Sequence, residues 1–437
     1  MNSVNPNGAL ARNVRRLGHI DLAGAGQVTL QGSYAYVGHI PNRAHLGTTI
    51  LDVSDPRNPR TVATITLTDT TSHSHKARVA GDIMIVNHER NPSAIGRRAD
   101  ELPRVRAQLT QALGRAPTHA ELAQKLSVKA EDIGEIEKEA QRGYHNGGFK
   151  IYDVSKPAAP REITHQRTGG IGVHRFDMDE RYAYISTEME GFLGNILVIY
   201  DIRDPQRPAE VSRWWMGGQH VAGGETPSWS GRRFALHHAI VSGKLAYAAW
   251  RDGGMTMLDI ADPTAPKLRA HRNWCPPFGG GTHTPLPLPG RNLAVFADEG
   301  NLDNCANGVQ RCWVFDVREP ANPVQIAAFP TPAEEDYCKK GAKFGPHNLH
   351  ENRPGSFQSE QLIFATYQNA GVRVFDITDP FAPREVAHFV PPAPEKMVDP
   401  RPNRPRVIQS NDVYVAPDGL MYVTDVNDGL TILQYRG

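Results

Sequence analysis

Five histidines occupy equivalent positions in successive copies of a repeated strand pattern. In each copy the histidine opens an apolar strand, and a turn connects that strand to a second one, as in residues 237–249. These histidines are His75, His174, His237, His283 and His347. Imidazole nitrogens are good ligands for iron, copper, zinc and manganese. Five imidazoles that converge from separate strands therefore predict a transition-metal site.

Five histidines are more than one metal site needs. A single open metal site needs three or four protein ligands, so some of the five are left to orient substrate or to act as acid or base. All-histidine ligation with open positions favours redox or oxygen chemistry, with iron or copper as the expected metal. Zinc or manganese would instead indicate hydrolysis or elimination by metal-bound hydroxide. The alternative without a metal is that each histidine bonds separately to backbone or water.

Four residues at the ends of second strands are candidates for catalytic roles. Because the second strand runs antiparallel to the first, it ends on the side where the histidine lies. The candidates are Glu89, Glu188, Glu299 and Tyr367. Carboxylates at this end can accept a ring N–H from a ligating histidine or complete the coordination sphere. For each glutamate, an ordinary solvated loop carboxylate is the alternative interpretation.

Aromatic residues precede several of the histidines in the chain. They are Trp214, Trp215, Phe278, Tyr337 and Phe344. Small-molecule pockets are lined mainly by apolar and aromatic side chains. Beside a metal site, these residues predict a small organic substrate of apolar or aromatic character.

A strand that ends in aspartate, followed by a Pro-x-x-Pro turn, marks the far end of each repeat. The aspartates are Asp52, Asp153, Asp201, Asp259, Asp316 and Asp376. A period of roughly 50–60 residues with four strands per copy is typical of a β-propeller. Seven copies can be counted, and the last lacks its outer strand, which residues 13–20 can supply. The sequence therefore predicts an all-β, seven-bladed β-propeller closed by an N-terminal strand.

One segment interrupts the period inside the second copy. Between residues 91 and 143 apolar residues recur at helical spacing, and Thr118 with Glu121 forms a capping-box pattern. The predicted organisation is propeller over 1–90, a helical insertion in blade 2 over 91–143, and propeller over 144–437. The insertion leaves from the end of the propeller that carries the histidines, termed here the mouth. We expect it to cover the mouth as a lid or to join two copies of the chain.

Overall composition limits the kinds of partner. The net charge of +1 gives no sign of a nucleic-acid partner, and no apolar run is long enough to span a membrane. Residues 112–123 resemble the helix-turn-helix opening of sigma-factor region 3, but without a basic excess DNA binding is not expected. The first residues do not form a signal peptide, which favours the cytoplasm, although a chain whose leader had been removed would look the same.

The four cysteines show no zinc-ribbon spacing. They are Cys275, Cys305, Cys312 and Cys338. Cys305 and Cys312 flank a loop and could pair in an exported protein. In the cytoplasm, free and partly buried thiols are expected instead.

The repeat tails resemble a known family. Residues 51–56 (LDVSDP) and 375–380 (FDITDP) are similar to the LVIVD-repeat family of bacterial propeller proteins, and the likeness extends over nearly the whole propeller. The resemblance implies the fold and says little about function. More loosely, a ring of propeller histidines is similar to the carotenoid-oxygenase type of iron enzyme and to the selenium-binding protein or methanethiol-oxidase type, without a shared extended motif.

These observations together predict a metal-dependent enzyme that acts on a small molecule at the mouth. An oxidoreductase is the first expectation, and a metal-dependent hydrolase or lyase is the nearest alternative. The alternative from another class is a non-catalytic propeller scaffold that binds a protein partner, which predicts no stoichiometric metal.

Overall fold

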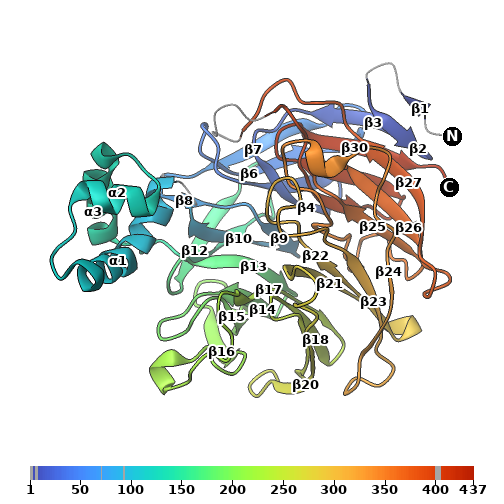
Figure 1. Ribbon diagram of the computed structural model, residues 1–437. Helices are drawn as coiled ribbons and strands as arrows, with labels where there is room; N and C mark the ends of the chain where they lie inside the picture. The colour runs from blue at the N-terminus through green and yellow to red at the C-terminus, as the bar shows by residue number, and fades with distance from the viewer. Residues whose placement is uncertain (1–2, 5–7, 70, 92–93, 399–404) are drawn as a thin grey trace.

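Antiparallel sheets are arranged around a common centre in the computed structural model (Figure 1). The structure describes residues 3–4, 8–69, 71–91, 94–398 and 405–437. Within these ranges, hydrogen-bond pairing gives six sheets, and the eight-stranded one contains two four-stranded units joined at Arg251 opposite Thr282. Counted separately, these two units bring the number of blades to seven. First strands of neighbouring blades contact one another, so they line the centre. The architecture is the predicted β-propeller.

The first four blades follow one another along the chain. The first contains β4 (Ala25–Gln31), β5 (Tyr34–His39), β6 (Leu46–Asp52) and β7 (Arg60–Thr66). The second contains β8 (Ser72–His73), β9 (Ala77–Ala80), β10 (Ile83–Arg90), β11 (Gly148–Asp153) and β12 (Arg161–Arg167). The third contains β13 (Val173–Met178), β14 (Tyr182–Thr187), β15 (Ile196–Asp201) and β16 (Ala209–Trp214). The fourth contains β17 (Phe234–Ser242), β18 (Leu245–Arg251), β19 (Met255–Asp259) and β20 (Lys267–Arg272).

The last three blades bring in strands from the start of the chain. The fifth contains β21 (Thr282–Leu288), β22 (Leu293–Asp298), β23 (Cys312–Asp316) and β24 (Val324–Ala328). The sixth contains β25 (Leu362–Thr366), β26 (Val372–Asp376), β27 (Arg384–Val390), β2 (Leu10–Arg12) and β1 (Ser3–Val4). The seventh contains β28 (Ser410–Val415), β29 (Leu420–Asp425), β30 (Gly429–Tyr435) and β3 (Val14–Ile20). Short 3₁₀ turns lie at Ala130–Asp132, Val221–Gly223, Pro289–Arg291 and Tyr337–Lys339.

N-terminal strands close the ring. β3 pairs antiparallel with β30, from Val14 opposite Tyr435 to Ile20 opposite Leu430. This pairing confirms the predicted closing strand. The preceding strand β2 pairs with β27 of the sixth blade. One N-terminal segment therefore fastens two neighbouring blades.

The aspartate at the end of each third strand organises the turn that follows. The Asp52 carboxylate accepts the Ser54 backbone N–H at 2.9 Å and an Arg60 guanidinium N–H at 3.1 Å. Asp153 and Asp376 bond in the same way to residues two and eight positions later. This is an Asx turn, which explains the aspartate of the repeat tail.

Apolar packing lies between blades, whereas the centre is polar. Ile85 of the second blade and Phe176 and Ile185 of the third belong to one buried cluster, and similar clusters join the other blades. Charged side chains from different blades meet in the centre, where Arg175 donates to Glu351 at 2.9 Å. Blade packing thus rests on apolar contacts away from the mouth.

Three helices form the insertion between β10 and β11 and lie to one side of the propeller (Figure 1). They are α1 (Ala94–Leu113), α2 (His119–Leu126) and α3 (Ile133–Arg142). The capping box forms as predicted, since Thr118 and Glu121 exchange hydrogen bonds. Leu102, Leu122 and Ile136 belong to a cluster made of insertion residues alone, so the helices bury their apolar faces on one another. The lid role stays a prediction. No helix in the described ranges is long and apolar enough to cross a membrane.

Candidate metal centre

β-Bulges place most of the ring residues. The pairing of β13 with β14 skips His174, and the pairing in the fourth and fifth blades skips His237 and His283. Asn411, at the equivalent position of the seventh blade, is skipped in the same way. A bulge leaves its extra residue out of the ladder and re-aims the side chain. The ring side chains therefore lie where regular strand pairing is interrupted at the mouth.

The five histidines predicted from the repeats lie side by side in the predicted order. The centroid of the His75 ring is 5.2 Å from that of His174, and His174 is 4.9 Å from His237. His237 stacks on His283 at 3.5 Å, and His283 is 4.5 Å from His347. Imidazoles from five blades therefore form one continuous arc.

Three of these imidazoles have Nδ1 held by an acceptor oxygen. The acceptors are the Glu89 carboxylate for His174 at 2.9 Å, the His283 carbonyl for His237 at 2.6 Å, and the Asn411 carbonyl for His347 at 2.5 Å. A carbonyl oxygen only accepts, so Nδ1 must carry the proton. Nε2 is then left with a lone pair, which is the form that binds a metal.

The Nε2 atom of His237 is buried and has no hydrogen-bond partner among the described residues. Burial, followed by the charge of neighbouring His283, holds the pKa of His237 well below its ordinary value, so the ring is neutral. A buried polar atom without a partner is costly. A metal ion is a partner that suits an unprotonated imidazole nitrogen.

Glu299 faces two of the imidazoles. Its carboxylate oxygens lie 3.5 Å from His283 Nε2 and 3.7 Å from His347 Nε2. Burial lowers the pKa of His347 to about 3, so no proton lies between its Nε2 and the carboxylate. Although burial opposes ionisation of Glu299, the charges of Arg251 and Lys343 lower its pKa. Two electron-pair donors thus face each other, which is the arrangement of ligands around a cation.

The same carboxylate binds Arg251 at the end of β18. One guanidinium nitrogen of Arg251 donates to Glu299, and the other lies 3.3 Å from His174 Nε2. Arg251 therefore connects the two sides of the arc. Arg251 lies at the end of a second strand, as the predicted glutamates do. The same sequence signal could therefore have identified Arg251 as a candidate site residue.

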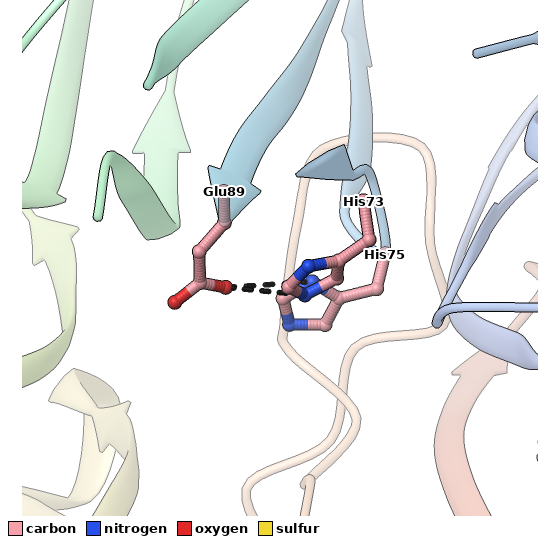
Figure 2. Close-up of side chains that lie close together, drawn as sticks. All are labelled: His73, His75 and Glu89. Atoms are coloured by element: carbon pink, nitrogen blue, oxygen red, sulfur yellow. Dashed lines mark ion pairs between the residues drawn. The ribbon is translucent and has the colours of Figure 1, made fainter. Parts of the chain in front are cut away.

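A second carboxylate, Glu89, faces the opposite part of the arc. It accepts from His174 Nδ1 and lies 3.3 Å from His73 Nε2 and 3.8 Å from His75 Nδ1. Figure 2 shows His73 and His75 on one side of the Glu89 carboxylate. The ligand atoms of these three residues lie within 4.8 Å of one another, as do those of His283, Glu299 and His347. His73 is not among the five histidines predicted from the repeats, although its spacing of two from His75 is that of strand residues on one face and could have identified it.

Two of the predicted catalytic residues, Glu188 and Tyr367, make contacts that stabilise the fold. The Glu188 carboxylate accepts the backbone N–H of Ile171 at 3.0 Å and so stabilises a loop. Tyr367 is buried in an apolar cluster with its hydroxyl 3.7 Å from Cys312 Sγ. The prediction that Tyr367 lies at the mouth is wrong: Thr366 bonds to the central Asn348, and strand alternation sends the next side chain the other way.

The aromatic residues expected to form a substrate pocket also pack elsewhere. Trp214 lies against Trp250, and Phe278 lies against Trp313. Trp215 contacts Phe192, and Tyr337 stacks on Phe344 within a buried cluster. The expected aromatic wall is therefore absent at these positions, and the side chains beside Glu299 are Arg251 and Lys343.

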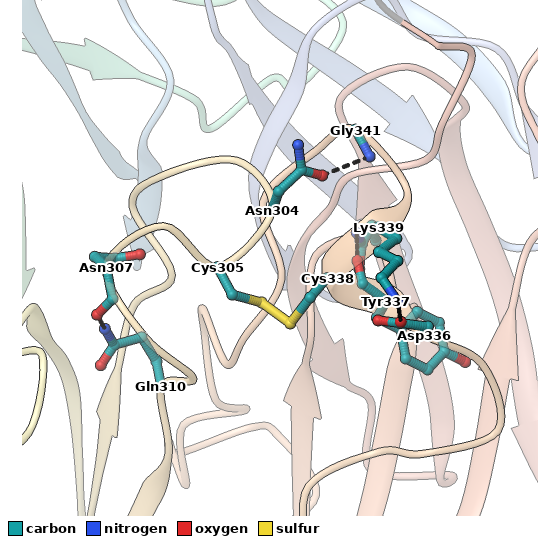
Figure 3. Close-up of a disulfide and its surroundings, with 10 residues drawn as sticks. Asn304, Cys305, Asn307, Gln310, Asp336, Tyr337, Cys338, Lys339 and Gly341 are labelled. Carbon is teal, nitrogen blue, oxygen red and sulfur yellow. Dashed lines mark hydrogen bonds and ion pairs between the residues drawn. A yellow bond between two sulfur atoms is a disulfide. The ribbon is translucent and has the colours of Figure 1, made fainter.

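A disulfide joins two loops next to the ring. Cys305 pairs with Cys338 (Figure 3). Cys312 is a buried free thiol whose pKa is raised by burial. The expectation of free thiols holds for Cys275 and Cys312 and is wrong for Cys305 and Cys338. The alternative pairing of Cys305 with Cys312 does not form, because Cys312 begins β23 and points into the core between blades. The bridged loops follow Glu299 and precede His347, so the disulfide fixes the backbone on both sides of this ligand group.

Comparison with known proteins supports the fold. The profile of the LVIVD repeat matches residues 24–66 and 238–271, so the chain contains LVIVD repeats. No curated protein matches the chain. Among solved structures, a periplasmic gluconolactonase from Pseudomonas aeruginosa is similar with a TM-score of 0.53 and 12% identity, over 91% of this chain and 93% of that one.

Other similar structures belong to different kinds of protein. The Cps50 (Swd1) β-propeller domain of Myceliophteria thermophila has a TM-score of 0.52 and 9% identity, over 97% of this chain and 99% of that one. U3-55K has a TM-score of 0.54 and 8% identity, over 96% of this chain and 98% of that one. At such low identity these likenesses establish the β-propeller fold alone.

Proposed function

We propose that the histidine arc binds a transition-metal ion and that the protein is a metal-dependent oxidoreductase acting on a small organic molecule. The observation that carries this proposal is the pair of facing donors His347 Nε2 and Glu299. A lone pair 3.7 Å from a carboxylate oxygen, with the other ring nitrogen protonated, is stabilised by a cation between them. The unpartnered Nε2 of His237 supplies a further donor beside His283.

The donor set favours iron. His283, His347 and Glu299 form a group of two imidazoles and one carboxylate, which is typical of non-haem iron(II) oxygenases. Copper suits an all-imidazole site better, so the carboxylate moves the preference towards iron. Iron supplies one-electron and oxygen chemistry to a bound organic molecule.

The chain's own residues have separable roles in this proposal. His237, His283, His347 and Glu299 are the ligands, and Glu89 orients His174 by accepting its Nδ1–H. Arg251 holds Glu299 in place before the metal arrives. The disulfide-linked loops keep Glu299 and His347 at a fixed separation.

Hydrolysis or elimination remains the second candidate because Glu299 is a carboxylate. Oxygen donors with imidazoles also suit zinc and manganese, and metal-bound hydroxide would then be the nucleophile. The identity of the bound metal separates the two candidates. A protein without stoichiometric metal would favour the non-catalytic scaffold.

The test is the metal content of protein purified without added chelator, measured by inductively coupled plasma mass spectrometry. About one iron per chain is expected, and His237→Ala and His347→Ala should lose it while keeping the circular dichroism of the parent. His271→Ala is the matched control, because His271 lies on the outer strand β20 of the same blade as His237 and bonds to the Gly253 carbonyl. Full occupancy in both ring variants would disprove the assignment.

A further inference from the structure

We infer that the mouth recognises a substrate that carries an anionic group, a carboxylate or a phosphate, and that Arg233, Arg251 and Lys343 bind it. The inference rests on the proposed metal site and adds the class of its substrate. It replaces the apolar or aromatic substrate expected from the sequence, because the aromatic side chains pack on other aromatic residues and not on Glu299, whose charged neighbours are Arg251 and Lys343.

Two cations share one carboxylate at the mouth. Arg251 donates to Glu299, and Lys343 Nζ lies 3.8 Å from the other oxygen of the same group. The Lys343 side chain keeps 29% of its surface exposed, compared with 7% for Arg251. Arg251 is therefore the inner cation and Lys343 the one that meets solvent.

A third cation stands beside them. Arg233 immediately precedes β17, and its neighbour Phe234 pairs with Arg251 across the strands. The Arg233 residue is exposed, and its backbone is fixed because its N–H donates to Asp252 at 2.8 Å. Because Arg233 is the residue next to the Phe234–Arg251 pair, its charge lies within electrostatic reach of the inner cation.

Metal binding changes the balance of charge at these three residues. While no metal is bound, Glu299 is the shared counter-ion of Arg251 and Lys343 and offsets part of their charge. If Glu299 ligates a divalent cation, both side chains lose much of their counter-charge and stand near additional positive charge. An incoming anion restores the balance, and a guanidinium presents paired N–H donors that fit carboxylate or phosphate oxygens. The excess positive charge of the metal site and the three cations therefore favours binding of a negatively charged substrate.

The backbone at Arg251 does not require arginine. Arg251 has a φ of 52°, and Gln368 occupies the equivalent turn of the sixth blade with a φ of 49°. Gln368 uses its amide to bond the Gly300 carbonyl at 3.0 Å. The same turn thus accepts a neutral amide, so Arg251→Gln should fold while removing the charge.

The experiment is calorimetric titration of metal-loaded protein with succinate and, separately, with inorganic phosphate. One of the two should bind to the parent. Arg233→Gln, Lys343→Gln and Arg251→Gln should each weaken that binding about tenfold, the loss expected for one charged hydrogen bond. Tighter binding of succinate assigns a carboxylate substrate, and tighter binding of phosphate assigns a phosphorylated one.

Metal content and a control variant keep the outcomes separate. Lys340→Gln removes a lysine from the same loop that pairs with Glu335 and not with Glu299, so it should bind the probe as the parent does. Removal of the metal with a chelator should weaken probe binding in the parent, because Glu299 then offsets part of the charge of the cations. A metal-loaded parent that binds neither probe, or Arg233 and Lys343 variants that bind unchanged, would overturn this inference alone. A chain that holds no metal would overturn the proposed function and this inference with it.

Discussion

At the scale of single residues, Glu89 determines how His174 is presented. Its carboxylate accepts the Nδ1–H at 2.9 and 3.0 Å, so Nε2 faces Arg251. Although burial opposes ionisation of Glu89, the charge and hydrogen bond of His174 lower its pKa. A charged acceptor behind an imidazole raises the basicity of the opposite nitrogen. Glu89 is in this respect a positioning residue.

We predict that Glu89→Gln weakens metal binding about tenfold, the lower end of the usual effect of changing a residue beside the ligands. Glu89 orients His174, and His174 contacts Arg251, which holds the ligand Glu299. The amide keeps the shape of the side chain and removes its charge. Glu188→Gln is the matched control, since the Glu188 carboxylate accepts a backbone N–H in a loop. Competition for the metal against a chromophoric chelator measures the change, and equal affinity in parent and Glu89→Gln would show that the orientation of His174 does not affect the ligands.

The ring histidines could be predicted because the repeats align them, and the repeat is a property of the sequence. Which nitrogen faces the centre could not, because it depends on carbonyls such as those of His283 and Asn411 that bulges bring close. The role given to Tyr367 failed for a related reason. Thr366 faces the central Asn348 and side-chain alternation turns Tyr367 away, but the sequence did not show which of these two neighbours faces the mouth.

Among the elements, the loops beside the ring and the helical insertion are stabilised by different interactions. The loops that flank Glu299 and His347 are linked by the Cys305–Cys338 disulfide and by the Asn304 N–H, which donates to the Ala342 carbonyl at 2.9 Å. The insertion instead has its own apolar core and an ion pair of 3.3 Å between Glu139 and Arg90. Loss of the disulfide should therefore affect the site. Loss of the insertion should have little effect on folding of the propeller.

We predict that replacing both Cys305 and Cys338 by serine lowers stability. A closed loop of 33 residues corresponds to about 4 kcal/mol in the chain-entropy treatment of the unfolded state. Differential scanning calorimetry should record a lower Tm than in the parent, and a reducing agent should have the same effect on the parent. Cys275→Ser, which removes a free thiol, is the control. An unchanged Tm would mean that the loops are held by their hydrogen bonds alone.

Replacement of residues 91–143 by a short Gly-Ser turn should leave a folded, metal-binding propeller. β10 and β11 pair along their length, from Ile83 opposite Asp153 to His88 opposite Gly148, so they form a hairpin without the helices. Metal content and Tm should stay close to those of the parent. A fall in turnover would support a lid, whereas a change from oligomer to monomer in light scattering would assign the insertion to assembly. Loss of folding would contradict the separate core.

At the scale of the whole molecule, the seven-fold repeat determines the architecture. The strand pattern, the Asx turns and the repeat period all indicate a propeller. The closing strand could be recognised because the last repeat has no outer strand of its own. The extra pairing of β2 with β27 could not be predicted, since three residues carry little pattern and their partner lies more than 370 residues away. The direction of the helices also depends on packing that periodicity does not describe.

We predict that deletion of residues 1–20 destabilises the protein and makes it associate. β30 would lose its partner β3, and β27 would lose β2, so these two interior strands would become exposed edge strands. Calorimetry should give a lower Tm, and size-exclusion chromatography with light scattering should detect larger species. Deletion of residues 1–9, which keeps β2 and β3, is the control. A monomer with the parental Tm after the longer deletion would show that the edges do not depend on these strands.

The position of β3 has a consequence for synthesis of the protein on the ribosome. The strand leaves the exit tunnel long before its partner β30, with Leu430 opposite Ile20. Vectorial folding can complete the first five blades in turn, but the sixth and seventh must capture a segment that has waited unpaired while those blades are made. A nascent chain that lacks β30 would therefore keep β3 accessible to chaperones, and emergence of β30 would set the moment of ring closure.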